Sequence, residues 1–516
     1  MKMRTLMTTG GAMTLMAATM LAAGAAQAAT KAAKAAPWPS AQLDASAAQT
    51  VDPAQIVSLQ QLRDWQVDLD QRGLRATGSP SHEAYVTELH KRLLAAGLKD
   101  VRYETLSMQR WTPGAWSLTV LGGPSAGKLP TAGYVPYSGI TPAAGLSAPL
   151  VGMPKDRSQD AGMAGKIVVF DLPKVPLTVG FFKKLALFSY DPENSLPAET
   201  PYVRPHNEIA VADAALRRIE AAGAAGGIAI VDDVAETAHG AYYPYGGDLR
   251  KVPSLFVDRD TGARLKAIAD GNTSVRLALP AKVETVPTRN IVAIIPGMSD
   301  ELVVINSHTD GTNGVEDNGP NIAVAIAQYL NRLPREALPR SVMVLLTSGH
   351  FAGGNGAIDF FKRHENDGLL KRIAATVTIE HLGSQEYLAG ADGKLAPTGQ
   401  AELAAMFMPR VPALVEASSK FLRDADATRS FVMPPLNPEN KGTHHGAVWP
   451  GEGQYFWSQG DLPNINYISG PTYLLHWGVT TADKVDYERM RRETVGFTQM
   501  MLDLSRLPMS ELRPQP

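Results

Sequence analysis

The sequence predicts an α/β protein built on a mixed, mostly parallel sheet that is flanked by helices. Three short runs, residues 302–305, 341–347 and 375–379, have the length and the apolar character of strands that are buried on both faces. Residues 321–330, between the first two runs, have the spacing of a helix with one apolar face. Strands that alternate with such a helix are typical of α/β sheets.

Each of these strands ends at a side chain that can take part in chemistry. His308 follows the first strand, His350 the second and Glu380 the third, while a fourth apolar piece, residues 465–468, leads to His476. Ligands of open α/β sheets bind outside the carboxyl ends of the strands. Polar strand ends can serve solubility alone, but four endings of this kind in one half of the chain favour a functional site.

The residues after the first strand have the layout of a metal site. His308 can supply a nitrogen ligand, and the carboxylate of Asp310, two residues further on, can hold the second ring nitrogen. Asp317 lies in a loop rich in Gly and Asn and can offer one oxygen to each of two metal ions. The alternative for this stretch is an ordinary polar turn after a strand.

The rest of the chain supplies the outer elements. Helices are expected at 54–69, 82–96, 211–222 and 411–422, and strands at 101–106, 165–170, 227–231 and 252–257. Between Pro113 and Ala281 the chain becomes rich in Gly and Pro with short strands, which indicates an inserted domain. Residues 172–207 within it form a long excursion rich in Pro and aromatic residues, either a lid or a poorly ordered loop.

The amino terminus has the features of a cleavable signal peptide over residues 1–28. Lys2 and Arg4 precede an uncharged stretch rich in Ala, Met and Leu, and Ala26-Gln27-Ala28 forms a small-residue cleavage site. An uncleaved membrane anchor is the alternative. Residues 29–50 are expected to be a linker, and the protein is expected to be exported, to the periplasm or out of the cell, with no stable membrane insertion after cleavage.

Composition limits the other classes of function. With 516 residues, 44% of them hydrophobic, the chain can bury a large core in two or more domains. The net charge of −2 offers no basic field for a phosphate backbone, which argues against a nucleic-acid partner. There is no cysteine, so core packing and any bound metal must stabilise the fold without disulfides.

Several ordered motifs resemble those of one family, the secreted zinc aminopeptidases, whose relatives include glutaminyl cyclases and glutamate carboxypeptidases. The motifs are Arg75-x-Thr77-Gly78-Ser79-Pro80, Asn290-Ile291-Val292-Ala293, His308-x-Asp310, Asp317-Asn318-Gly319, and His476 with Asp483 to Asp486. They span residues 51–111 and 281–507. The resemblance implies a catalytic domain made of residues 51–112 and 282–516, interrupted by a protease-associated domain at 113–281.

The resemblance also implies the ligands of the metal. In the family two zinc ions share one Asp, and a Glu acts as general base on the bridging water. This implies His308, Asp317, Glu380 and His476 as metal ligands, with Asp310 supporting His308. His444 and His445, in a later loop, either line a substrate pocket or lie in solvent.

The sequence departs from the family where two adjacent Glu residues are expected. In one register His350 takes the position of the general base and Phe351 that of a ligand, so that one zinc ion is bound. In the other register His350 is itself the ligand and two ions are bound. The first register is favoured because the glycine spacing after Phe351 fits it better.

The expected function is therefore that of a secreted, metal-dependent aminopeptidase, which cleaves residues from the amino termini of peptide or protein substrates with metal-activated water. Two alternatives remain. The first is a catalytically degenerate binding protein of the same fold, and the second is an acyl transferase of the glutaminyl cyclase kind that uses one zinc ion.

Overall fold

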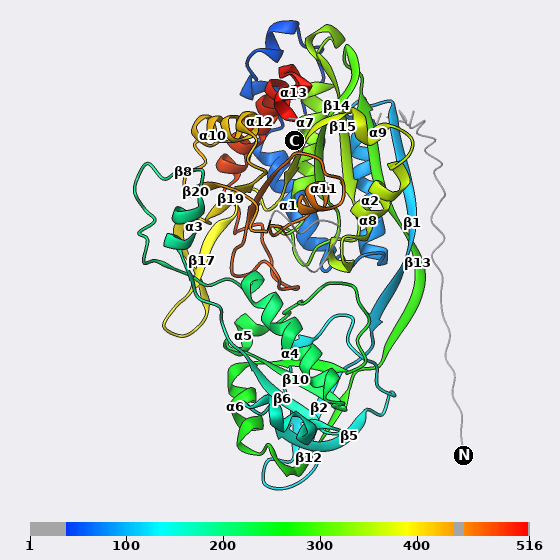
Figure 1. Ribbon diagram of the computed structural model, residues 1–516, viewed down its shortest axis with the longest axis vertical. Coiled ribbons are helices and arrows are strands. Elements are labelled where there is room, and N and C mark those ends of the chain that lie inside the picture. Colours follow the sequence, from blue (N-terminus) through cyan, green and yellow to red (C-terminus); the bar gives the residue numbers. More distant parts are fainter. Residues whose placement is uncertain (1–37, 438–447, 514–516) are drawn as a thin grey trace, which may run out of the picture. The chain divides into compact units, whose positions relative to one another are not determined.

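The computed structural model, which describes residues 38–437 and 448–513, confirms the predicted fold class. A mixed sheet of nine strands lies between two layers of helices (Figure 1). In spatial order its strands are β1 (Asp100–Pro113), β13 (Ala281–Ile295), β15 (Arg340–Thr347), β14 (Ser299–His308), β16 (Ile373–Ile379), β21 (Asn464–Ser469), β19 (Ala404–Phe407), β20 (Ser430–Met433) and β8 (Phe188–Tyr190).

The centre of this sheet is buried on both faces, as the apolar runs predict. Along β14, Val303 and Ile305 pack against one layer of helices, whereas Leu302 and Val304 pack against the other. Side chains that alternate between the faces of a strand explain why the run is continuously apolar.

The two layers of helices come from different parts of the chain. The first layer contains α1 (Leu59–Arg72), α2 (Pro80–Ala95), α7 (Gly319–Leu330), α10 (Pro412–Asp424), α12 (Tyr487–Arg506) and α13 (Met509–Leu512). The second contains α8 (Asn355–His364), α9 (Leu369–Arg372) and α11 (Gln454–Ser458). Helix α1 begins later than predicted because Ser58 caps it, its hydroxyl accepting a hydrogen bond from the backbone N–H of Gln61.

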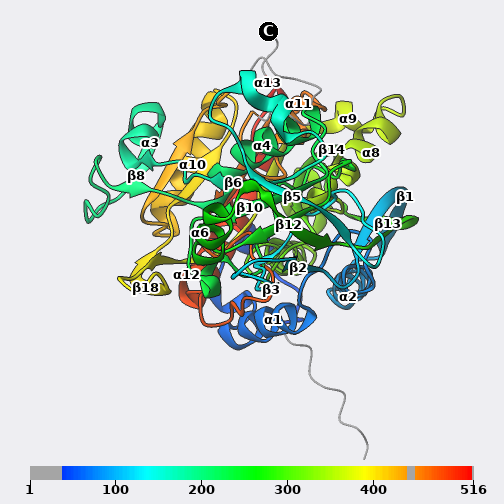
Figure 2. The same cartoon turned by 90° about the horizontal axis from the view of Figure 1, so that it is seen from below.

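A second sheet forms from residues between β1 and β13. Its eight strands are, in spatial order, β3 (Gly127–Leu129), β2 (Ser117–Val120), β12 (Asp270–Ala278), β5 (Leu146–Gly152), β6 (Ile167–Leu172), β10 (Gly226–Val231), β11 (Ser254–Val257) and β4 (Gly133–Tyr134). Helices α4 (Ile209–Ala221) and α6 (Arg259–Ala267) flank β6 and β10 (Figure 2), and α5 (Ala235–Ala238) follows β10. Pro113 and Ala281 are register partners at the ends of β1 and β13, so the chain leaves and re-enters this pair of strands at one point.

The long excursion expected inside the inserted domain packs on the main sheet instead. It contains β7 (Leu177–Thr178), α3 (Val179–Leu185), β8 and β9 (Pro201–Tyr202). Strand β8 is the antiparallel partner of β20, and Phe182 packs with Phe431 of the main sheet. The alternative of a poorly ordered loop over residues 172–207 was therefore wrong, because Phe182 and Tyr202 belong to a hydrophobic core that local sequence does not reveal.

The expected linker at residues 29–50 is also shorter than predicted. The structure describes it from Trp38 on, and Trp38 is buried against the ring of Trp65 at a centroid distance of 6.0 Å. The backbone N–H of Leu43 donates to the carbonyl of Arg332, and Ala48 is buried. These residues are part of the folded domain, whereas the expected signal peptide lies outside the described residues.

The remaining strands, β17 (Gln385–Ala389) and β18 (Leu395–Ala401), form a separate hairpin. Among the helices in the described part of the chain, none has the length and apolar character that a membrane span requires.

Candidate metal centre

The parallel centre of the main sheet brings three strand ends together. Strands β15, β14, β16 and β21 are parallel neighbours in that order, so their carboxyl ends meet at one edge. His308 is the last residue of β14, His350 follows β15, and Glu380 and His381 follow β16. All four side chains are buried, with 5% exposure or less.

Four of the side chains at this edge point ligand atoms at one another. Nε2 of His308 lies 3.4 Å from Oε2 of Glu380 and 3.8 Å from Oε2 of Glu316. The other oxygen of Glu316 lies 3.6 Å from Nε2 of His381. Glu316 belongs to the loop between β14 and α7, one residue before the expected ligand Asp317.

Hydrogen bonds fix which nitrogen of each imidazole faces this centre. Nδ1 of His308 lies 2.8 Å from the backbone carbonyl of Asp310, and Nδ1 of His381 lies 2.5 Å from the carbonyl of Ser469. A carbonyl can only accept, so in both rings Nδ1 carries a proton, and in the neutral ring Nε2 is the nitrogen with a free lone pair. Both Nε2 atoms are therefore ready to bind a cation.

None of these ligand atoms has a hydrogen-bond partner. Nε2 of His308, Oε2 of Glu316, Oε2 of Glu380 and Nε2 of His381 are all buried and unpartnered. A buried polar atom without a partner costs about 1–3 kcal/mol, so four of them at one point would be a large penalty in the protein alone. A metal ion at this point would satisfy the ligand atoms of His308, Glu316 and His381 together.

The charges of the cluster also favour a bound cation. Glu316, Glu380 and Glu452 lie around imidazoles whose neutral form binds metal. Although burial lowers the pKa of His308, the carboxylates of Glu316 and Glu380 outweigh it and hold that pKa well above its ordinary value. Burial raises the pKa of Glu380, but the adjacent imidazole of His308 brings that pKa down to about 2. The carboxylates thus favour a positive charge at this point, which a metal ion would supply.

The backbone of His381 is strained in a way that fits a functional site. Its φ is +59°, in the left-handed region that residues with a side chain rarely adopt. Such strain costs on the order of 1–3 kcal/mol and persists only where the surroundings impose it. Here it turns the ring of His381 back towards Glu316, next to Glu380 at the end of the same strand.

His350 lies beside the cluster and is paired with a carboxylate that the sequence patterns did not single out. Its Nδ1 lies 2.9 Å from Oε2 of Glu452, and its ring stacks on that of His308 at a centroid distance of 4.2 Å. Burial and the neighbouring His308 lower the pKa of His350, but Glu452 raises it above the ordinary value overall. Gly349, at φ +86°, provides the left-handed turn after β15 from which His350 enters the site.

The position beside His350 is apolar. Phe351 is 1% exposed, and its ring lies 4.5 Å from that of Tyr245 and 5.7 Å from that of Tyr242. It therefore offers no ligand atom.

Asp310 supports the site differently from the expectation. Its carboxylate does not hold the imidazole of His308, because the backbone carbonyl of the same residue does so. The carboxylate instead accepts hydrogen bonds from the backbone N–H groups of His350 and Phe351, at 3.2 and 2.8 Å, and from the hydroxyl of Thr77 at 2.6 Å. Asp310 thus fixes the turn that carries His350.

Asp317 does not face the cluster, which corrects its expected place among the ligands. Both of its oxygens accept from Arg75, at 2.6 Å from Nε and 2.5 Å from Nη2, and both side chains are fully buried. Arg75 also donates to the backbone carbonyls of Leu69 and Asn313, at 3.0 and 2.6 Å. With Asp317 held by a buried guanidinium, Glu316 is the acid of this loop that reaches the centre.

His476 does not reach the centre either. Its Nδ1 donates to the backbone carbonyl of His239 at 3.1 Å, and burial lowers its pKa. The backbone of Tyr242 donates to the carbonyl of Leu475, and that of Trp477 donates to Gly240. His476 therefore belongs to the contact between the main domain and the second sheet, while His444 and His445 lie outside the described residues.

Two cavities lie near the cluster. The smaller has a volume of about 60 Å³ and is lined by Glu316, Glu380 and His381 together with apolar side chains. The larger is an open cleft of about 570 Å³. His350 and Tyr245 line both, so the two spaces meet at these side chains, beside the cluster.

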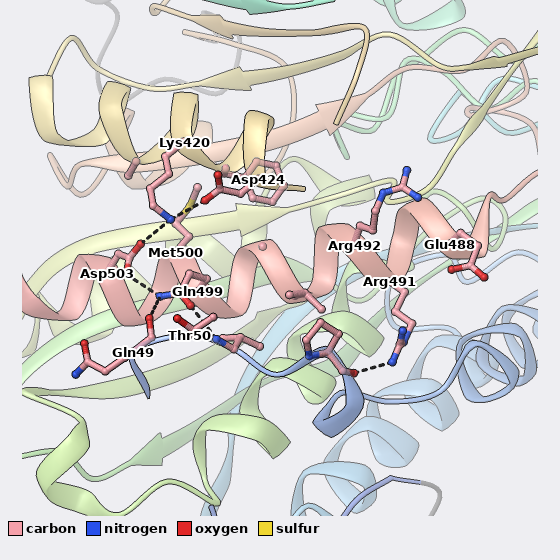
Figure 3. Close-up of a pocket in the computed structure, with 16 residues that line it drawn as sticks. Gln49, Thr50, Lys420, Asp424, Glu488, Arg491, Arg492, Gln499, Met500 and Asp503 are labelled. Atoms are coloured by element: carbon pink, nitrogen blue, oxygen red, sulfur yellow. Dashed lines mark hydrogen bonds and ion pairs between the residues drawn. The ribbon is translucent and has the colours of Figure 1, made fainter. Parts of the chain in front are cut away.

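A further pocket, of about 510 Å³, lies between α10, α12 and residues 49–53 (Figure 3). None of the cluster residues lines it. Several of its polar side chains bind one another: Lys420 pairs with Asp424 and Asp503, and Gln499 donates to Asp503. These observations give it no evident chemistry.

Comparison with solved structures places this architecture among the aminopeptidases in fold. A zinc aminopeptidase from Bacillus subtilis superimposes with a TM-score of 0.59 at 14% identity, over 86% of this chain and 94% of that one. A peptidase M28 precursor from Shewanella amazonensis gives 0.57 at 17% identity, over 87% and 96%. An aminopeptidase from an Aneurinibacillus strain gives 0.55 at 14% identity, over 86% and 93%.

The sequence adds the family. Residues 290–413, which carry the cluster's four side chains and His350, match the model of peptidase family M28. No curated protein matches the chain in sequence. The family assignment and the zinc aminopeptidase fold agree with the resemblance seen in the motifs.

Proposed function

We propose that this protein is a metal-dependent exopeptidase that removes residues from the amino termini of peptides. The match to peptidase family M28 and the aminopeptidase fold support a hydrolase of the metallopeptidase class. The observation that carries the proposal is the convergence of four buried, unpartnered ligand atoms at the carboxyl edge of a parallel sheet.

The proposed ligands of one metal ion are His308, Glu316 and His381, whose ligand atoms lie within 4.8 Å of one another. Glu380 forms a second group of this kind with His308 and His350. Because both groups share His308 and its Nε2 can bind only one ion, a single ion fits the donors better than two. Imidazole with carboxylate suits zinc.

When bound, such an ion would act as a Lewis acid and lower the pKa of a water molecule in the site. The chain itself supplies the proton transfers. With Nδ1–H of His350 donated to Glu452, its Nε2 is the basic nitrogen, which can accept a proton from the attacking water and return it to the leaving amine. Glu452 holds the tautomer and stabilises the imidazolium, so this pair takes the place of the glutamate base expected in the family.

The surroundings favour an amino terminus over a carboxyl terminus as the bound end of the peptide. Among the described residues that line the small cavity there is no Lys or Arg to bind a terminal carboxylate. The large cleft, which shares His350 and Tyr245 with the small cavity, leaves room for the rest of the chain.

The decisive experiment compares His381, whose Nε2 faces the centre, with His476, which the resemblance implied as a ligand. Metal content and hydrolysis of aminoacyl p-nitroanilides are measured for the wild type, His381→Ala and His476→Ala, before and after chelation and with added zinc. We expect His381→Ala to lose both metal and activity and His476→Ala to keep its metal. Equal metal content in wild type and His381→Ala would reject the ligand set, and wild-type turnover that does not depend on zinc would reject the proposed chemistry.

Export and the nature of the second sheet also belong to this proposal. The charges of Lys2 and Arg4, the apolar stretch after them and the Ala-rich cleavage site support removal of residues 1–28 on the way to the periplasm or the outside. Sequencing the amino terminus of the mature protein tests this. We regard residues 113–281, apart from the excursion that packs on the main sheet, as a protease-associated module that limits access to the cleft.

A further inference from the structure

The small cavity beside the metal centre is a pocket with mostly apolar walls. Its volume is about 60 Å³. The polar end is formed by the cluster, and the apolar walls by Phe182, Tyr202, Leu403, Ala405, Phe407 and Ile468.

The end of this pocket is built by two different parts of the chain. Ala405 and Phe407 come from β19 of the main sheet, whereas Phe182 comes from α3 in the excursion between β6 and α4. Phe182 is held by its neighbours, since its ring lies 5.0 Å from that of Tyr202 and 6.0 Å from that of Phe431. The excursion therefore contributes a fixed wall to the site.

The pocket and the open cleft share Phe182 and Phe407 as well as His350 and Tyr245. A peptide that lies in the cleft with its scissile bond at the cluster would place one side chain in the pocket. In the proposed reaction the first residue of the peptide is the one released, so that side chain belongs to the terminal residue.

The volume of the pocket limits which side chain fits. For comparison, a cavity of about 150 Å³ lined by apolar side chains binds benzene. At about 60 Å³ the pocket has room for a small aliphatic group but not for an aromatic ring. A cationic side chain would lose its water among apolar walls, because Glu316 and Glu380 are committed to the metal centre.

We propose that this pocket selects peptides whose first residue has a small aliphatic side chain, such as alanine or valine, and that Phe182 sets the size limit. The selection rests on the proposed function, because the pocket is placed by the metal centre. A hydrophobic pocket discriminates by roughly 10- to 200-fold between substrates whose side chains differ by one methylene. We therefore expect at least a tenfold preference in kcat/KM for valine over phenylalanine.

The test uses p-nitroanilides of alanine, valine, phenylalanine and lysine with four proteins: wild type, Phe182→Ala, Phe181→Ala and Ala405→Leu. Phe182→Ala removes one ring from the pocket and should raise kcat/KM for phenylalanine relative to valine at least tenfold. Phe181→Ala is the matched control, since Phe181 neighbours Phe182 on α3 and also lines the open cleft, but does not line the pocket. Ala405→Leu fills part of the pocket from β19 and should lower kcat/KM for valine more than for alanine.

Binding of L-valinamide and L-phenylalaninamide, followed by ligand-observed NMR, separates this proposal from the proposed function. If none of the substrates is turned over, the proposed function is rejected. The proposed selection by the pocket would still be supported if the wild type binds only valinamide and Phe182→Ala binds both amides. Three results would overturn the proposed selection by the pocket. The wild type could prefer phenylalanine or lysine, the preference could stay unchanged in both Phe182→Ala and Ala405→Leu, or the wild type could bind neither amide. Melting curves show whether each variant is folded. If Phe182→Ala is not folded, the result for Ala405→Leu tests the proposed selection.

Discussion

The buried pair of Arg75 and Asp317 offers a sharp test of the site, because it separates a structural carboxylate from a metal ligand. Arg75→Met removes the guanidinium and leaves the fully buried carboxylate of Asp317 without a partner. Removing one member of a buried ion pair costs about 3–5 kcal/mol, whereas replacing both members by apolar residues is often neutral. We therefore expect Arg75→Met to lower the free energy of unfolding by about 3–5 kcal/mol, and the double variant Arg75→Met/Asp317→Leu to recover a large part of it.

The assay is urea unfolding, followed in parallel by fluorescence and circular dichroism, with metal content measured on the folded protein. The folded double variant should keep its metal, because His308, Glu316, Glu380 and His381 are untouched. A variant that is folded but has lost its metal would show that Asp317 is a ligand after all. A loss below about 1 kcal/mol for Arg75→Met would show that the pair is not buried as the structure has it.

Two further predictions concern the catalytic pair and the metal. Glu452→Gln should lower kcat about 10²-fold or more with KM little changed. Because Glu452 raises the pKa of His350, its removal should also move the acidic limb of the pH–rate profile to lower pH. An acidic limb that does not move would show that His350 is not the base. Chelation should lower the melting temperature of the wild type, because an ion at 100 times its Kd stabilises the folded state by about 2.7 kcal/mol. If His381→Ala has lost the metal site, this variant should melt at the same temperature with and without chelator.

The sequence by itself determined the central sheet and the edge at which the site forms. Runs such as 302–305 predict strands buried on both faces, and parallel strands place their carboxyl ends together, so the apolar pattern alone is enough to bring His308, His350 and Glu380 to one place. His381 lies next to Glu380 and follows from the same pattern, but nothing in the spacing distinguishes it from His476.

Only the tertiary structure decided which neighbouring side chain faces the centre. Glu316 and Asp317 are adjacent acids in one loop, and the choice between them depends on Arg75, which lies 242 residues from Asp317. His476 donates a hydrogen bond to the carbonyl of His239, because backbone contacts between the main domain and the second sheet bring the two residues together. Glu452 and Phe182 reach the site from distant segments. Local patterns define strands and their ends, but the direction of a side chain in a loop is set by the partners that remote parts of the chain bring to it.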